Sequence, residues 1–172
     1  MTDTAMKAAE RQADGRAGMY LAFVLAGEEY GLEILKVREI IQMCKITPVP
    51  RTPDYVKGVI NLRGKVIPIL DLRLKFNMPE TEHTEQTCII VVDVDGLETG
   101  VIVDQVSEVL DIPADDIDDT PAFGTDLDTE FILGIGKAQG KVSILLDIAK
   151  VVGTGDGAAG LRRAVEDAEQ EE

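Results

Sequence analysis

The sequence predicts a mainly all-β protein with short helices, built from two small β-barrel subdomains that pack together. Three observations lead to this prediction. Apolar residues make up 45% of the chain and are mostly Ile, Val and Leu, with no Trp and only 4% aromatic residues, a composition typical of strands. They occur in short runs separated by turns that contain Gly. The chain also repeats itself, which predicts two copies of one small barrel.

The repeat consists of two matching segments in each half of the chain. "YGLEILKVREII" (30–41) matches "TGVIVDQVSEVL" (99–110), and "YVKGVINLRGKVIPILDL" (55–72) matches "FILGIGKAQGKVSILLDI" (131–148) without a gap. The offset grows from 69 to 76, which places a seven-residue insertion in the acidic loop of the second half. The expected repeat halves are about 28–77 and 97–152.

The first elements follow from local patterns. Residues 1–18 are polar and Ala-rich and are expected to form a disordered arm. The run "MYLAFVLAGEEYGLEI" (19–34) predicts a hairpin with its turn at Gly27-Glu28-Glu29. The apolar residues of "ILKVREII", which begins at Ile34, fall at helical spacing and predict a turn or two of helix.

The centre of the chain predicts a loop, a hairpin and a helical turn. Three prolines between residues 48 and 53 predict a loop in an extended conformation. The segment "GVINLRGKVIPILDL" (58–72) predicts a hairpin around a Gly64-Lys65 turn, and "DLRLKF" (71–76) a short helical turn.

The second half begins after a polar linker at residues 77–87. "CIIVVDVDGLETGVIVD" (88–104) predicts a hairpin around Asp95-Gly96. The folded domain is expected to span residues 19–152. A flexible Gly-rich joint and an acidic tail are expected at residues 153–172, where Leu161, Val165 and Ala168 share a helical face.

Composition excludes several classes of partner. A formal net charge of −15 and a pI near 4.4 argue against binding to nucleic acid or to anionic lipid, because both need clustered Lys and Arg. No apolar run is long enough to span a membrane, and the N-terminus lacks a secretion signal. We therefore expect a cytoplasmic protein with no direct membrane insertion. Cys44 and Cys88 are expected to be buried thiols rather than a disulfide.

Residues suited to catalysis are sparse, so no enzyme activity, cofactor or metal is expected. The single histidine, His83, lies in the polar linker without nearby ligands for zinc. The acidic loop lacks the central Gly and the closing Glu of a calcium loop, which favours a solvated loop. Asp71 and Asp147 match each other in the repeat and precede helical turns, which favours N-caps over catalytic carboxylates. A hydrolase would need perturbed carboxylates converging between the barrels.

One difference between the repeats points to a partner. Arg63 is matched by Gln139 and Asn61 by Lys137, so "NLRG" is not required by the fold alone. An Arg near a turn suits a protein interface, because its planar guanidinium can pair with a carboxylate of a partner. The alternative is a solvated turn charge. A crevice between the two barrels is the expected place for such a partner.

The segments "EEYGLEILKVREI", "TPDYVKGVINLRGKVIPILDLRLKF", "TGVIVDQVSEVL" and "LLDIAKVV" resemble the CheW family of chemotaxis coupling proteins over about residues 18–152. The resemblance implies two five-stranded SH3-like barrels. It also implies an adaptor that bridges chemoreceptor cytoplasmic hairpin tips to the regulatory domain of the histidine kinase CheA, so that receptor state controls kinase autophosphorylation. The positions that match receptor-binding positions of the family are Val37, Glu39, Gly58, Asn61, Arg63 and Val109.

Contacts with the kinase are harder to carry over. The resemblance implies that the ends of the barrels contact CheA and that such contacts can close into rings. In this sequence the candidate kinase-binding segment is the loop that contains Phe123. Better-known members tend to have a basic residue where this sequence has Asp118, which puts ring-type pairing there in doubt. The protein would be recruited from the cytoplasm to membrane receptor arrays. The alternative function is a CheW-like scaffold in a non-flagellar chemosensory pathway.

Overall fold

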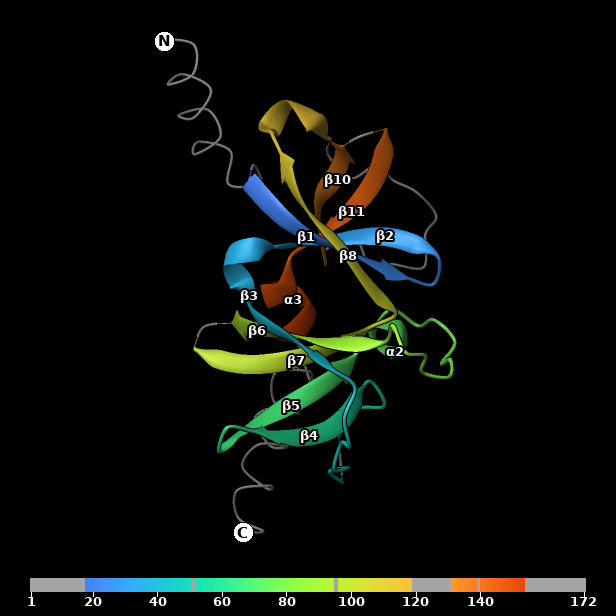
Figure 1. The fold of residues 1–172 in the computed structure, drawn as a ribbon, viewed down its shortest axis with the longest axis vertical. Helices are drawn as coiled ribbons and strands as arrows, with labels where there is room; N and C mark the ends of the chain where they lie inside the picture. Colours follow the sequence, from blue (N-terminus) through green and yellow to red (C-terminus); the bar gives the residue numbers. More distant parts are fainter. Residues whose placement is uncertain (1–17, 51, 95, 119–130, 139, 154–172) are drawn as a thin grey trace.

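The computed structural model describes residues 18–50, 52–94, 96–118, 131–138 and 140–153, and they form two antiparallel-rich sheets. Residues 1–17 of the expected arm, residues 154–172 of the expected tail and Phe123 lie outside the described residues. The two sheets each curl into a barrel, one above the other in Figure 1. The first sheet, here called barrel A, contains β1 (Gly18–Leu25), β2 (Glu28–Glu33), β8 (Gln105–Ile112), β9 (Ile117–Asp118), β10 (Ile132–Ala138) and β11 (Lys141–Leu146).

The second sheet, here called barrel B, repeats the order of the first five strands of barrel A and has no counterpart of β9 among the described residues. Barrel A runs β8-β1-β2-β11-β10-β9 and barrel B runs β3-β6-β7-β5-β4. In each barrel one pairing is parallel, β2 with β11 and β5 with β7. The strands of barrel B are β3 (Val37–Gln42), β4 (Val56–Leu62), β5 (Lys65–Asp71), β6 (Cys88–Val94) and β7 (Leu97–Val103).

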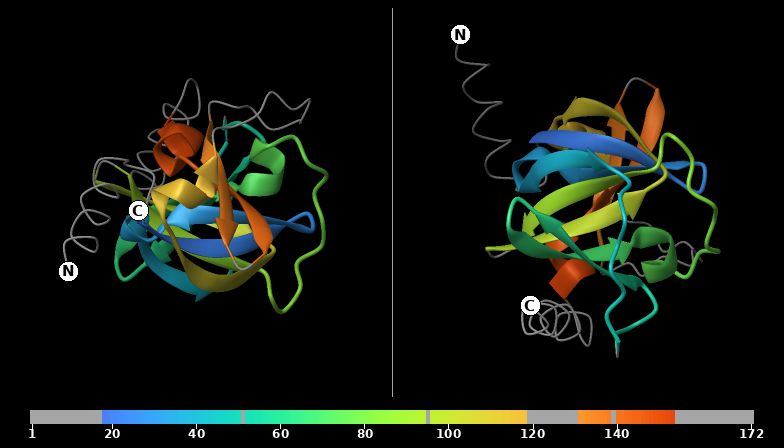
Figure 2. Two further views of the ribbon diagram at one scale, coloured as in Figure 1. Left: turned by 90° about the horizontal axis from the view of Figure 1, so that it is seen from above. Right: turned by 60° about the horizontal axis from the view of Figure 1, so that its bottom comes forward.

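The two barrels do not coincide with the two repeat halves. Barrel B is one continuous stretch of chain, 37–103, inserted between β2 and β8 of barrel A. Figure 2 shows that blue and orange strands, from opposite ends of the described chain, lie together in barrel A. The parallel pairings cause this exchange, because each joins a strand of one half to a strand of the other. The predicted all-β class with two barrels is confirmed, but barrel A has a sixth, two-residue strand, β9, beyond the five expected.

Each barrel closes through the segment that follows its edge strand. In barrel B, Thr47 forms a bridge with Val59 of β4, with backbone bonds of 2.9 Å in both directions. In barrel A, the 3-10 helix η2 (Ala114–Asp116) leads into β9, which pairs with β10. Closure matters because an open sheet edge would leave backbone groups free to pair with other chains.

The three predicted hairpins are confirmed. The β6–β7 turn lies between Val94 and Leu97 as predicted, whereas the other two turns lie one residue earlier than expected. Arg63-Gly64 forms the turn between β4 and β5, with φ values of +53° and +84°, and Ala26-Gly27 forms the turn between β1 and β2 with +53° and +82°. Two successive positive φ values are typical of the type I′ turn, whose twist matches that of the flanking strands. Arg63 therefore lies within the turn, in a conformation that costs a non-glycine residue about 1 kcal/mol.

Of two other local predictions, the helical turn after Ile34 is confirmed only in part, and the burial of both cysteines was wrong. The helical turns expected from Ile34 shrink to one 3-10 helix, η1 (Ile34–Lys36), because Val37 already begins β3 and pairs with Val92 of β6. Cys44 is exposed in the loop after β3, and Cys88 is half-buried at the start of β6. Burial raises the pKa of the Cys88 thiol.

Both predicted N-caps are confirmed. The Asp71 carboxylate accepts hydrogen bonds from the backbone N–H groups of Arg73 and Leu74 at the start of α2 (Leu72–Lys75). The Asp147 carboxylate accepts one from Lys150 in α3 (Ile148–Gly153). Each cap satisfies N–H groups that have no partner within their helix.

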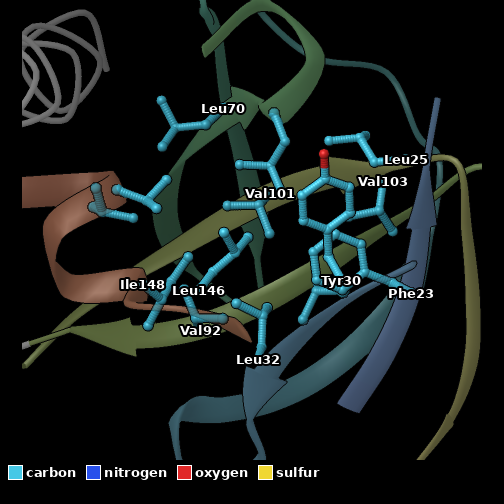
Figure 3. Packing of buried hydrophobic residues seen from close by; sticks show 14 of the residues in the cluster. Phe23, Leu25, Tyr30, Leu32, Leu70, Val92, Val101, Val103, Leu146 and Ile148 are labelled. Carbon is cyan, nitrogen blue, oxygen red and sulfur yellow. The ribbon is translucent and has the colours of Figure 1, made fainter. Parts of the chain in front are cut away.

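Three apolar clusters hold the molecule together. One fills barrel A around Tyr20 and Leu110, and one fills barrel B around Ile60 and Ile89. The largest lies between the barrels and is called the inter-barrel cluster. In Figure 3, side chains of both barrels meet in it, with the Phe23 and Tyr30 rings stacked at a centroid distance of 5.7 Å. Its members include Phe23, Leu25, Tyr30, Leu32, Leu70, Val92, Val101, Val103, Leu146 and Ile148.

The chain passes between the barrels twice, at η1 and at Asp104. Asp104 is held by Arg73 of α2, whose Nε and Nη2 donate to its two carboxylate oxygens at 2.9 and 2.5 Å. The Asp104 carboxylate also accepts from the backbone N–H of Ala26 at 2.9 Å. Burial raises the pKa of Asp104, but the hydrogen bonds from Arg73 and Ala26 outweigh it, so the pKa lies below its ordinary value.

Asp104→Asn is expected to lower the free energy of unfolding by about 2 kcal/mol at pH 7, because a charge-assisted pair is lost in a partly buried place. Because the pKa of Asp104 is lower in the folded protein than in the unfolded chain, its ionised carboxylate stabilises the fold at every pH above the ordinary carboxyl pKa of about 3.9. This stabilisation is lost as the pH falls below that value. The difference between wild type and variant, measured by urea unfolding, should therefore stay constant above that pH and shrink below it. A difference that does not change with pH would contradict this account.

Candidate functional site

The edge strands β3 and β8 carry three of the six predicted receptor-binding residues, Val37, Glu39 and Val109. Each strand pairs on one side only, β3 with β6 and β8 with β1. In Figure 1, β8 crosses the upper barrel and β3 the lower one, both on the viewer's side. Val37 and its repeat counterpart Val106 are half-buried against the inter-barrel cluster. The cluster therefore reaches the surface along these two strands.

Exposed apolar side chains extend this surface. Val109 is 44% exposed and lies opposite Leu21, while Ile40 is 45% exposed and lies opposite Ile90. Residues opposite each other in a ladder point to the same face, and both partners belong to the inter-barrel cluster. Ile40 and Val109 thus project from the same face as that cluster, one from each barrel. We call Val37, Ile40, Val106 and Val109 the apolar rim.

Sequence reasoning missed Ile40 and Leu35 as candidate site residues. Leu35, in η1 beside the start of β3, is 94% exposed. Ile40 had a signal in the sequence, because the repeat matches it with Val109. A large apolar side chain with so much of its surface in water suggests an interaction site when others lie nearby.

Glu39 and Arg63 form an ion pair with each other. Arg63 Nη1 donates to Glu39 Oε1 at 2.9 Å, and Nη2 donates to Oε2 at 2.7 Å. The pair joins β3 to the β4–β5 turn, which are the two ends of the sheet order in barrel B. The Arg63 side chain is 75% exposed and that of Glu39 25%. An exposed pair of this kind adds at most about 1 kcal/mol to stability, so a large stabilising role is not its explanation.

Asn61 and Gly58 have structural tasks in β4. The side-chain oxygen of Asn61 accepts a hydrogen bond from the backbone N–H of Gly64 at 3.0 Å, which fixes the turn that carries Arg63. Gly58 is buried with φ +143°, and a Cβ atom there would lie 2.0 Å from the carbonyl oxygen of Thr47. Gly58 therefore makes room for the segment around Thr47, whose bridge to Val59 closes barrel B.

The end of barrel A that contains β9 and β10 has an ion pair of its own and a hollow beside it. Asp118 in β9 forms an ion pair of 2.6 Å with Lys137 of β10, and the hydrogen bond that Lys137 donates to the Asp118 carboxylate raises the pKa of Lys137. Beside this pair lies a hollow of about 310 Å³, which contains none of the predicted site residues. It is lined by Asp116, Lys137, Ala138, Gly140, Lys141 and Val142.

Metal sites and membrane-spanning helices are two further features that bear on function. No group of three or more His, Cys, Asp or Glu side chains that could hold a metal ion occurs among the described residues. In the same part of the chain, no helix has the length and the apolar character that crossing a membrane requires.

Comparisons with known proteins agree on one family. The CheW-like domain family matches residues 19–155. The chain is 42% identical to the chemotaxis protein CheW of Klebsiella aerogenes over 133 residues, which is 77% of this chain and 80% of that protein. It is 35% identical to CheW of Bacillus subtilis over 133 residues, 77% of this chain and 85% of that protein. The crystal structure of the scaffolding protein TtCheW from Thermoanaerobacter tengcongensis matches with a TM-score of 0.75 and 36% identity, covering 82% of this chain and 95% of that one.

Proposed function

This chain belongs to the CheW-like family of chemotaxis scaffolding proteins, and on that premise we propose that it is a non-enzymatic adaptor between chemoreceptors and the kinase CheA. In this proposal the cytoplasmic hairpin tip of a receptor binds along the apolar rim. The regulatory domain of CheA binds elsewhere on the same molecule. The adaptor is recruited from the cytoplasm to receptor arrays at the membrane.

The observation that carries the proposal is the apolar rim together with the Glu39–Arg63 pair. Glu39 lies on the rim strand β3, opposite Val91, and so on the other face of that strand from Ile40. An amphipathic helix lays its apolar face into an apolar groove and places its polar side chains at the margin. Val37 and Val109 offer the apolar contact, and Arg63 retains donor groups that a partner carboxylate can reach because most of its side chain is exposed. Glu39 aligns Arg63 through two hydrogen bonds.

Gly58 and Asn61 act in this site through the backbone rather than by direct contact. Gly58 allows the Thr47 segment to close barrel B, and Asn61 fixes the Arg63-Gly64 turn. Changes at either position would then disturb receptor binding by moving Arg63. The candidate kinase contact is the loop that contains Phe123, which lies outside the described residues and follows Asp118 in the sequence.

An adaptor without catalytic groups changes kinase output only by binding the receptor's signalling states with different affinity. A ligand that binds two states equally shifts neither. Each contact in such an assembly can be weak, because linking many binding sites in one array raises the effective concentration. Ring-type contacts with CheA would supply that linkage.

A pair of matched variants tests where the receptor binds. Val109→Glu places a charge on the apolar rim, whereas Val142→Glu places one on an exposed β11 valine at the end of barrel A. We expect Val109→Glu to weaken binding of a purified receptor cytoplasmic fragment by on the order of thirtyfold, since burying an unpaired charge costs about 2 kcal/mol or more. Val142→Glu should leave that binding unchanged, as measured by calorimetry. Equal losses of receptor affinity in both variants would contradict the proposed binding site.

A further inference from the structure

The two crossings between the barrels occupy equivalent positions but are built differently. The repeat, with its offset of 69, matches Leu35 of η1 with Asp104, and each lies just before an edge strand, β3 or β8. Leu35 is 94% exposed, whereas Asp104 is held by a side chain of α2 and by a backbone N–H of the β1–β2 turn. The second half has Ala149 where the first has Arg73, so the residue that matches Arg73 cannot donate to the η1 crossing.

Arg73 and Asp104 connect segments that belong to different barrels. Arg73 lies on α2, which continues directly from β5 of barrel B and is fixed by the Asp71 cap. Asp104 is the single residue between β7 of barrel B and β8 of barrel A, and it accepts from Ala26 in the β1–β2 turn of barrel A. The chain of contacts therefore runs from barrel B through Arg73 and Asp104 to barrel A. Figure 1 shows β8 beginning beside α2.

Several ion pairs of the described residues stay within one barrel, and Lys57–Glu80 joins β4 of barrel B to the linker that follows α2. Arg38–Asp93, Arg63–Glu39 and Lys65–Glu98 each join two parts of barrel B, and Lys137–Asp118 joins two strands of barrel A. The inter-barrel cluster is apolar, and apolar contact is non-directional. Packed elements can slide over one another by small shear movements. A bidentate pair with fixed geometry resists such sliding.

We infer that Arg73 and Asp104 are positioning residues that fix barrel A relative to barrel B, and thereby set the spacing of the apolar rim. The rim has one strand from each barrel, and β8 begins at the residue after Asp104. Release of this clamp would let β8 move relative to β3 without unfolding either barrel. The inference about the rim rests on the proposed function, while the inference about the clamp does not.

Distances between spin labels test the clamp without any partner. One label is placed on Cys44, which is exposed beyond β3 of barrel B, and the other on Val142→Cys in β11 of barrel A. Cys88 is replaced by Ala to leave one native thiol. Arg73→Gln removes the clamp, and Arg38→Gln is the matched control, because it removes an Arg–Asp pair confined to barrel B with the same change in charge.

We expect Arg73→Gln to broaden the distribution of distances between the labels at least about twofold, while Arg38→Gln leaves it as in wild type. If Arg73→Gln does not fold, Arg73→Lys replaces it, since Lys keeps the charge but cannot form the two-pronged contact. A wild-type distribution in the folded Arg73 variant would overturn the inference.

Affinity for the receptor fragment then tests the link to the rim. We expect Arg73→Gln to weaken it on the order of tenfold, a typical coupling between sites, while affinity for the CheA regulatory domain stays within about twofold. An unchanged receptor affinity alongside a broadened distribution would overturn the role in positioning the rim. If wild type itself does not bind the receptor fragment, the proposed function fails, and the distance measurement still decides whether the clamp exists.

Discussion

Gly58→Ala is expected to lower the free energy of unfolding by at least about 3 kcal/mol, which is among the larger effects of single substitutions. An added Cβ would lie 2.0 Å from the Thr47 carbonyl oxygen and 2.7 Å from its carbon, both backbone atoms that cannot rotate away. The φ of +143° adds strain for any residue other than Gly. Thr47 would have to leave the bridge to Val59 that closes barrel B. A branched residue such as Val should be worse still.

Gly64→Ala is the matched control for this prediction. Gly64 also has a positive φ, +84°, but an added Cβ would meet nothing within 4 Å. Its expected cost is therefore only the backbone strain, about 1 kcal/mol. Urea unfolding followed by far-ultraviolet circular dichroism suits a chain without Trp. Equal losses in the two variants would show that the close approach of Thr47 does not limit stability.

Arg63→Glu is expected to raise the Kd for a receptor cytoplasmic fragment at least about thirtyfold, or ~2 kcal/mol. The change removes a cation from the margin of the apolar rim and sets a second carboxylate beside Glu39, which Arg63 now neutralises. Folding should change by no more than about 1 kcal/mol, because the pair is largely exposed. Binding to the CheA regulatory domain should be largely retained. Calorimetry with each partner measures both affinities.

The double variant Glu39→Arg with Arg63→Glu separates the two roles of the pair. It restores an ion pair across the same two strands but reverses the positions of the charges. We expect it to melt like wild type and yet to bind the receptor fragment as weakly as Arg63→Glu. If Arg63→Glu instead loses the folded state, or loses both partners equally, Arg63 is a structural residue.

Local features of the fold were predictable from the sequence. A turn with Gly between two apolar runs specifies a hairpin through neighbouring residues alone, and the β1–β2, β4–β5 and β6–β7 pairings are confirmed. The caps at Asp71 and Asp147 are likewise decided within three residues. The repeat also predicted two similar barrels, because equivalent sequences bury equivalent surfaces.

Long-range features were not predictable in the same way. The exchange of strands between repeat halves depends on the parallel pairings of β2 with β11 and of β5 with β7, which no local pattern encodes. Pairing with β6 turned the residues after η1 into a strand despite their helical spacing. The sequence indicated Glu39 and Arg63 separately, but only closure of barrel B brings them together. The Arg73–Asp104 contact, which spans both barrels, gave no signal in the sequence.

The proposed function is tested most directly by reconstitution. A purified receptor cytoplasmic fragment, CheA and ATP are combined with and without this protein, and CheA autophosphorylation is followed over time. We predict that phosphorylation rises only when all three proteins are present, and that Arg63→Glu abolishes the rise. Autophosphorylation that is the same with and without this protein, although the protein binds CheA, would contradict a role in coupling this receptor to the kinase.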